Sequence, residues 1–244
     1  MKMLLKRKNF HNSSPLLWSL LAVIFITIII WRNTFYYQRP VVKQLPDVPT
    51  ESALRVIAAS DQSFSYRLII FWLQQFDVQA GQYVSFSSLD YQKLSGWLSA
   101  LSTYEPASQY PMLLAARIYS RVSDGDRVRQ MLDLIYQQYK LNPEKNWRWL
   151  AEATITAQHK LKDKKLALKY ATALAEEKND KIPFWAKDMR LLILEQMGET
   201  EQIKLLVGGL MANKLVTDVN EIRFLDLLLQ RIEAKSGEKV KKVD

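Results

Sequence analysis

The chain has no cysteine among its 244 residues, and only two histidines, seven glycines and eight prolines. Without cysteine it can form no disulfide bond, no thiolate metal site and no cysteine nucleophile. Few glycines and prolines disfavour an all-β fold, whose many tight turns need them. The lack of cysteine does not decide the redox compartment, because many exported proteins also lack it.

Signatures of catalysis are missing as well. The sequence contains no zinc-protease, serine-hydrolase, phosphate-loop or dinucleotide-binding motif. An apolar run separates His11 from His159, so the two cannot form one site, and His159 is predicted to end a helix, where an imidazole suits the helix dipole. The one S-x-x-K sequence, Ser236 to Lys239, falls in a tail predicted to be disordered. We therefore expect no enzyme, no cofactor and no metal site.

The net charge of +9 is confined to the two ends of the chain. Four basic residues precede the apolar run, three follow it, and the tail from Lys235 carries an excess of two. The intervening residues, 47–234, are electrically neutral. A neutral domain offers no electrostatic footprint for a phosphate backbone, so we expect no nucleic-acid partner.

An uncharged stretch, PLLWSLLAVIFITIIIW at residues 15–31, is long enough to cross a bilayer. With the aromatic residues that follow, we interpret 15–37 as a transmembrane signal anchor and 1–14 as a basic N-terminus. A cleaved signal peptide and a buried soluble helix are the alternatives. Residues expected to contact lipid head groups are Lys2, Lys6, Arg7 and Lys8.

The basic residues before the span place the N-terminus in the cytoplasm and the rest of the chain outside it. We therefore expect a single-pass protein of a bacterial inner (cytoplasmic) membrane with an exported domain. In a Gram-negative bacterium that domain would be periplasmic.

The rest of the sequence predicts helices, and hence an all-α fold. Three prolines make 38–50 an extended tether. Beyond it we expect a short helix at 51–59 and a helical-repeat domain over 51–234, followed by a disordered tail at 235–244. The predicted helical hairpins lie at about 63–104, 111–140, 147–177 and 184–212, with a capping helix at 218–234. A second membrane span within 63–80 is the alternative there, but its apolar run is too short.

Helix starts near Pro111, Trp147 and Pro183 recur at about 36 residues, which is typical of stacked helix-pair repeats. Residues 110–143, YPMLLAARIYSRVSDGDRVRQMLDLIYQQYKLNP, resemble a tetratricopeptide repeat (TPR) in the small Ala115 and the closing Asn142-Pro143. Tyr119 departs from that pattern, which usually has Gly or Ala at this position. The resemblance extends over about 110–213. It implies a right-handed α-helical solenoid whose concave face binds protein segments.

Aromatic residues crowd into 64–110, where they would either fill the core of an atypical end pair or line a groove. Two tryptophans at 147 and 149 face different ways on a helix, so one of them could anchor a partner. The candidate interaction residues are Trp147, Trp149, Tyr110, Tyr83 and Phe86. We expect a membrane-anchored scaffold or assembly factor that binds another cell-envelope protein. The alternative is a lipid-, glycan- or peptide-binding protein that uses the aromatic groove at 64–110.

Overall fold

A computed structural model of the chain describes residues 15–35, 44–50, 52–54, 61–77, 86–213 and 216–241. Over these residues the structure has about 11 helices and no strand, which confirms the all-α prediction. Two compact units are present. The first comprises residues 1–43 and 80–82, of which the structure describes only α1 (Pro15–Phe35), and the second comprises 44–79 and 83–244.

Helix α1 is apolar on every side, and its described side chains are exposed. Two of its three hydroxyls bond to carbonyls of the helix itself, Ser19 Oγ to Leu16 O at 2.9 Å and Thr27 Oγ1 to Val23 O at 2.8 Å. Such internal bonds satisfy these two hydroxyls without water, as a lipid environment demands. Among the described residues, α1 alone is long and apolar enough to cross a membrane, a criterion that a signal sequence also meets.

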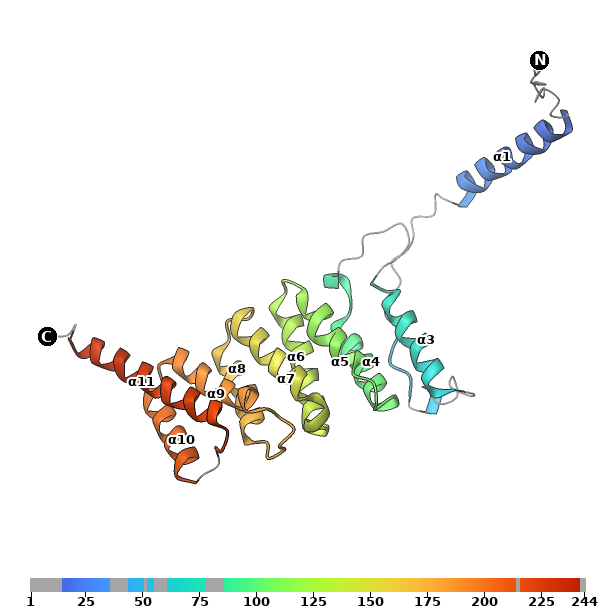
Figure 1. The fold of residues 1–244 in the computed structure, drawn as a ribbon. Coiled ribbons are helices and arrows are strands. Elements are labelled where there is room, and N and C mark those ends of the chain that lie inside the picture. Colours follow the sequence, from blue (N-terminus) through green and yellow to red (C-terminus); the bar gives the residue numbers. More distant parts are fainter. Residues whose placement is uncertain are drawn as a thin grey trace, which may run out of the picture. The chain divides into compact units, whose positions relative to one another are not determined.

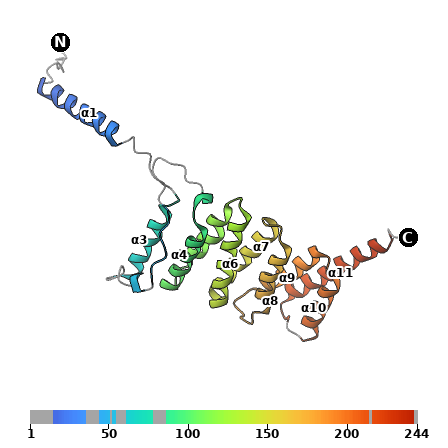
Figure 2. The same ribbon diagram turned by 180° about the vertical axis from the view of Figure 1, so that it is seen from behind.

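The second unit is built from helices that follow one another in sequence order (Figures 1 and 2). Two of its short elements, η1 and η3, are 3-10 helices and a third, η2, is a π-helix. The elements are α3 (Gln62–Gln74), η1 (Phe86–Ser88), α4 (Tyr91–Tyr104), α5 (Tyr110–Leu113), η2 (Leu114–Ile118), η3 (Tyr119–Arg121), α6 (Gly125–Leu141), α7 (Pro143–His159), α8 (Lys164–Glu176), α9 (Phe184–Met197), α10 (Thr200–Ala212) and α11 (Val219–Lys241). From α6 to α10, each helix packs on the next.

Aspartates precede five of these helices. The side chains of Asp61, Asp90, Asp124, Asp163 and Asp218 accept hydrogen bonds from backbone N–H groups in the first turn of α3, α4, α6, α8 and α11. These bonds satisfy donors that a helix start otherwise leaves unpaired. Gly198, with φ at 82°, adopts the left-handed conformation that ends α9.

Several boundaries differ from the prediction for local reasons. Helix α7 begins at Pro143 and not near Trp147, because Asn142 ends α6 and its side chain also accepts from Lys145 N to cap α7. The helix predicted from Pro111 is interrupted by the π turn of η2. Helix α3 ends at Gln74 and not near residue 80, and α11 continues to Lys241 into the predicted tail.

Two side-chain bonds join α6 to α8. Arg129 Nη1 donates to Asp163 Oδ2 at 2.6 Å, and Tyr139 OH donates to Ala173 O at 3.0 Å. Each of these bonds joins residues 34 apart. The two helices are thus held together at the start and near the end of α8.

The buried side chains form two cores. The main core runs from Leu45 to Ile193, and its largest fully buried residues are Tyr119 and Tyr170. A smaller terminal core joins α9, α10 and α11 around Leu194, Val207 and other aliphatic residues. Helix α9 contributes to both cores. Met189 and Ile193 pack into the main core, and Leu191 and Leu194 pack into the terminal core.

The second half of the predicted tether, residues 44–50, is packed on α4. Leu45 is 3% exposed, Trp97 Nε1 donates to Pro46 O at 3.0 Å, and Lys93 Nζ lies 2.8 Å from Asp47 Oδ1. A Cβ atom at Gly96 would lie 2.7 Å from Val48 Cγ2, so only glycine allows this close approach. The segment has no regular secondary structure but belongs to the folded unit.

Candidate functional site

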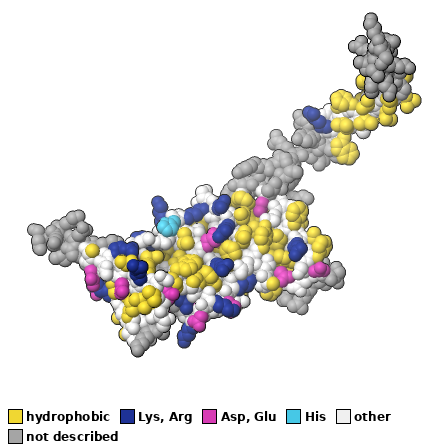
Figure 3. Space-filling view, viewed as in Figure 1, with side chains coloured by type: hydrophobic (Ala, Val, Ile, Leu, Met, Phe, Trp, Pro, Cys, Tyr) yellow, Lys and Arg dark blue, Asp and Glu magenta, His cyan; other side chains and the backbone are white. Residues whose placement is uncertain are grey.

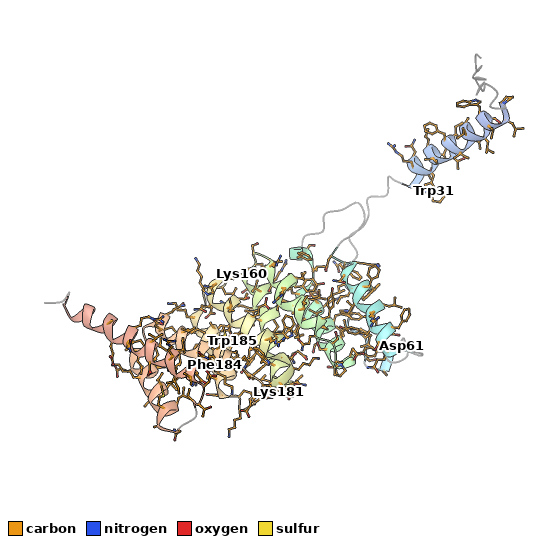
Figure 4. All side chains as sticks on the ribbon, in the orientation of Figure 1. Trp31, Asp61, Lys160, Lys181, Phe184 and Trp185 are labelled. Atoms are coloured by element: carbon orange, nitrogen blue, oxygen red, sulfur yellow. The ribbon has the colours of Figure 1, made fainter. Side chains whose placement is uncertain are left out.

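A groove runs along α7 in two hollows of about 970 and 510 Å³ that share Arg117, Glu152 and Ile155. We call it the α7 groove. Its walls come from the Gln109–Arg121 segment on one side, α7 in the middle, and the start of α9 with residues 181–183 on the other. Figure 4 labels Lys160, Lys181 and Trp185, which lie along this face.

Three tryptophans lie in the larger hollow. The Trp147 and Trp185 rings meet edge to face, with centroids 5.7 Å apart and an interplanar angle of 67°. Trp185 is 50% exposed, whereas Trp149 is 9% exposed and donates from Nε1 to Gln109 Oε1 at 3.1 Å. In this hollow Trp149 is thus held in place by its hydrogen bond, and the ring of Trp185 is open to a partner. In the space-filling view a patch of hydrophobic side chains covers this place, with Lys and Arg beside it (Figure 3).

Cations outnumber carboxylates along the α7 groove. It is lined by five Lys or Arg side chains and one carboxylate, and these are Arg117, Arg121, Arg148, Lys160, Lys181 and Glu152. Arg117 Nε donates to Glu152 Oε1 at 3.0 Å, and its guanidinium carbon lies 5.9 Å from the Trp149 ring centroid. Lys181 pairs with Glu144 outside the hollow. Arg121 and Arg148 have no carboxylate partner among the described residues.

Two of these cations stand close together at the narrow end. Lys160 Nζ donates to Ser120 O at 2.6 Å. Burial, and then the neighbouring Arg121, lower the pKa of Lys160, which means that the charged amine lacks full compensation. Residues 47–234 carry no net charge in sum, so the positive charge of the groove is balanced by an excess of acidic residues elsewhere in that stretch.

The predicted interaction residues fall at different places. Trp147 and Trp149 line the α7 groove. Tyr110 begins α5, and its hydroxyl accepts from Gln74 Nε2 at 3.0 Å. Phe86 packs edge to face on Tyr119, with centroids 5.9 Å apart, at the border of the main core. Tyr83, Lys2, Lys6, Arg7 and Lys8 lie outside the described residues.

Sequence reasoning missed Trp185, Arg117 and the other charged residues of the α7 groove. One signal could have found Trp185, since it lies about one repeat length after Trp147, at the start of the next predicted hairpin. The pairing of Arg117 with Glu152 joins two separate helices, and nothing in the local sequence of either one indicates it.

A second hollow lies in the aromatic-rich pair of α3 and α4. It measures about 300 Å³ and is lined by Leu54, Ser65, Leu68, Ile69, Trp72 and Trp97. The Trp72 and Trp97 rings lie 5.2 Å apart between centroids. Its lining is apolar except for Ser65, so this hollow suits an alkyl or acyl chain better than a sugar.

Tyr119 takes part in a buried hydrogen-bond chain. Its hydroxyl donates to Asp77 Oδ2 at 2.8 Å, and Tyr91 OH donates to Tyr119 O at 2.8 Å. Burial raises the pKa of Asp77 to about 6, although the bond from Tyr119 acts in the opposite direction. The large side chain of Tyr119 thus joins η3 to the turn after α3, which a Gly or Ala could not do. The bond from Tyr91 goes to the backbone carbonyl of Tyr119.

No three His, Asp or Glu side chains lie close enough to hold a metal ion in the part of the chain that the structure describes. Comparison with models of known protein families, with curated proteins and with solved structures gives no match. The function must therefore be argued from the α7 groove and from α1.

Proposed function

We propose that this chain is a membrane-anchored scaffold with a TPR-like helical-repeat domain, and that it binds an extended segment of another envelope protein in the α7 groove. The observation that carries the proposal is the composition of that groove. The edge-to-face pair of Trp147 and Trp185 shares the larger hollow with Arg148, which has no carboxylate partner among the described residues, and Arg121 lines the smaller hollow. Exposed tryptophan beside arginine is the combination most enriched at sites that dominate protein binding. The task is binding and not catalysis.

Three further features support a repeat architecture of the TPR type. Side-chain bonds join residues 34 apart in successive pairs. The small residues Ala115, Ala167 and Ala171 are fully buried, as the resemblance implies for helices that approach closely. The walls of the α7 groove come from the first helices of three successive pairs, which in such repeats line the concave face.

The charge of the groove defines the segment that it would bind. Arg121 and Arg148 favour carboxylates on the partner, and the open face of Trp185 favours an aromatic, proline or aliphatic side chain. We therefore expect an acidic segment with one apolar anchor. Its binding should weaken as salt rises, because exposed ion pairs are screened.

A photo-crosslinking amino acid at position 185 of the full chain tests this proposal in native membranes. A matched probe at Leu205, which is 77% exposed on α10 and does not line the groove, is the control. We expect one adduct from position 185 and none from 205, with an acidic partner peptide in its mass spectrum. Adding an excess of the unlabelled Trp147→Ala, Arg148→Glu variant should not reduce this adduct, because the variant should not bind the partner. Equal crosslinking from both positions, or none from 185, would refute groove binding.

We also propose the anchored, exported topology. A reporter enzyme that is active only outside the cytoplasm, fused after Asp244, should be active, and the chain should stay with membranes after alkaline extraction. An inactive fusion at normal expression contradicts export. A chain released by alkali contradicts the anchor and favours a cleaved signal sequence.

The apolar hollow between α3 and α4 favours a second candidate function, binding of a lipid chain. Native mass spectrometry of the full chain should then show a retained lipid that disappears in Leu68→Trp, which fills the hollow. A protein without bound lipid in both forms would exclude this function and leave the groove proposal untouched.

A further inference from the structure

Helix α3 is apolar on two opposite faces. One face, which includes Tyr66, Ile70 and Leu73, is buried in the main core. The other carries Phe64, Leu68 and Phe71, which are 58, 52 and 64% exposed. These three residues are spaced by four and three positions and therefore form one stripe on the helix surface. We call it the α3 stripe.

An exposed stripe of this kind needs a partner, because monomeric soluble proteins rarely leave contiguous large apolar side chains in water. Most other large exposed apolar side chains of the second unit, such as Leu141 and Leu205, are single residues on other helices. Helix α3 contains no Asp or Glu, and the exposed Asp61 precedes it as its cap. The one ionised side chain within the helix, Arg67, is exposed beside Leu68.

The chain connects this end of the unit to α1 by a short path. Helix α1 ends at Phe35, and the folded unit begins at Gln44, with Leu45 already buried against α4. Residues 36–43 are therefore all that separates them, and eight residues reach at most about 28 Å even when fully extended. Helix α3 packs on the same helix, α4, through Trp72 and Trp97.

The charge around the α3 stripe favours a membrane surface over a second copy of the chain as its partner. Phenylalanine and leucine beside a basic residue are features of helices that lie in the interface of anionic membranes, and α3 itself contains no acidic residue. Arg32, Arg39 and Lys43 add positive charge to the same part of the chain. A second copy would instead bring Arg67 against Arg67, which is unfavourable.

We infer that the α3 stripe lies in the head-group region of the membrane that α1 crosses. The folded unit would then be held to the bilayer at two places, by α1 and by the stripe. This inference rests on the proposed anchor and not on the α7 groove.

The absence of cysteine makes the inference directly testable on the full chain. A spin label on Gln75→Cys reports on the stripe and leaves its three apolar residues in place, since Gln75 is exposed one turn after Phe71. The label on Leu205→Cys is the matched water-exposed control. Both proteins are reconstituted into vesicles of zwitterionic and anionic phospholipid, and collision rates are measured with oxygen and with a water-soluble nickel chelate.

The label at 75 should collide with the nickel chelate several-fold less often than the label at 205, and more often with oxygen. Purely zwitterionic vesicles, or Phe64→Ser with Phe71→Ser, should remove much of this difference. Equal rates at both positions on a chain that floats with the vesicles would overturn the inference. Strong dipolar broadening between labels at 75 would also overturn it, because a second copy would then cover the stripe. A chain that does not float would refute the anchor itself.

Discussion

Replacing Asp188 by asparagine should stabilise the folded chain, and the gain should be larger at pH 8 than at pH 5. Asp188 lies on α9, is 5% exposed, and its Oδ2 has no hydrogen-bond partner in the described part of the chain. Burial first, and then the nearby Glu221, raise the pKa of Asp188 from 3.8 to about 7, against the opposing effect of Arg190.

The sign of the effect follows from where each state releases its proton. The unfolded chain releases it near 3.8, whereas the folded chain holds it up to about pH 7. The folded state therefore binds more protons between these values, and the free energy of unfolding falls as the pH rises through them. One pKa unit corresponds to about 1.4 kcal/mol, so this carboxyl group lowers stability by about 4 kcal/mol at pH 8. Asparagine has nearly the same shape and removes this penalty.

Urea unfolding of the full chain in detergent, followed by far-ultraviolet circular dichroism at pH 5 and pH 8, measures this difference. Asp180→Asn is the matched control, because Asp180 is exposed whereas Asp188 is buried. If Asp188→Asn instead destabilises the chain by the same amount at both pH values, Asp188 is ionised and paired in the folded state, and the reasoning is refuted.

Three further predictions concern contacts of the main core. Tyr119→Phe removes the donor to Asp77 and should lower the free energy of unfolding by about 1–3 kcal/mol, more at pH 8 than at pH 5, because that bond favours the ionised carboxylate. Equal losses at the two pH values would contradict the bond. Gly96→Val should displace residues 44–50 from α4, so that their amides exchange with deuterium faster while those of α8 do not; unchanged exchange would show that the segment tolerates the side chain. Asn142→Ala should cost about 0.5–2 kcal/mol through the lost cap of α7, whereas Asn142→Asp should retain most of the stability in the same urea titration.

Helix boundaries that depend on residues within one helix or one turn could be predicted from the sequence. Pro183 and Gly198 bound α9 where the sequence places it, since one starts a helix and the other ends it with positive φ. Asn142 ends α6 as the sequence predicts, but α7 begins at Pro143 and not near Trp147, because the Asn142 side chain caps a helix that follows the previous one without a loop. A Pro after Asn was interpreted only as an end, although Pro also suits the first position of a helix.

The candidate site could be predicted only in part. Trp147 could be predicted because two tryptophans two positions apart on one helix face different ways, so that only one of them can be fully buried. The charge of the α7 groove was not found, because a neutral total hides an uneven distribution. Arg121 and Lys160 come from different helices and meet only through the packing of η3 on α7. The π turn at η2 had no signal in the local pattern, since LAARI is a good regular helix by propensity.

Helix α9 is shared by the two cores of the folded unit and by the α7 groove. Ile193 packs into the main core, Leu191 and Leu194 pack into the terminal core, and Trp185 near its start faces the groove. A substitution that changes the packing of α9 is therefore expected to affect both cores and the shape of the α7 groove together.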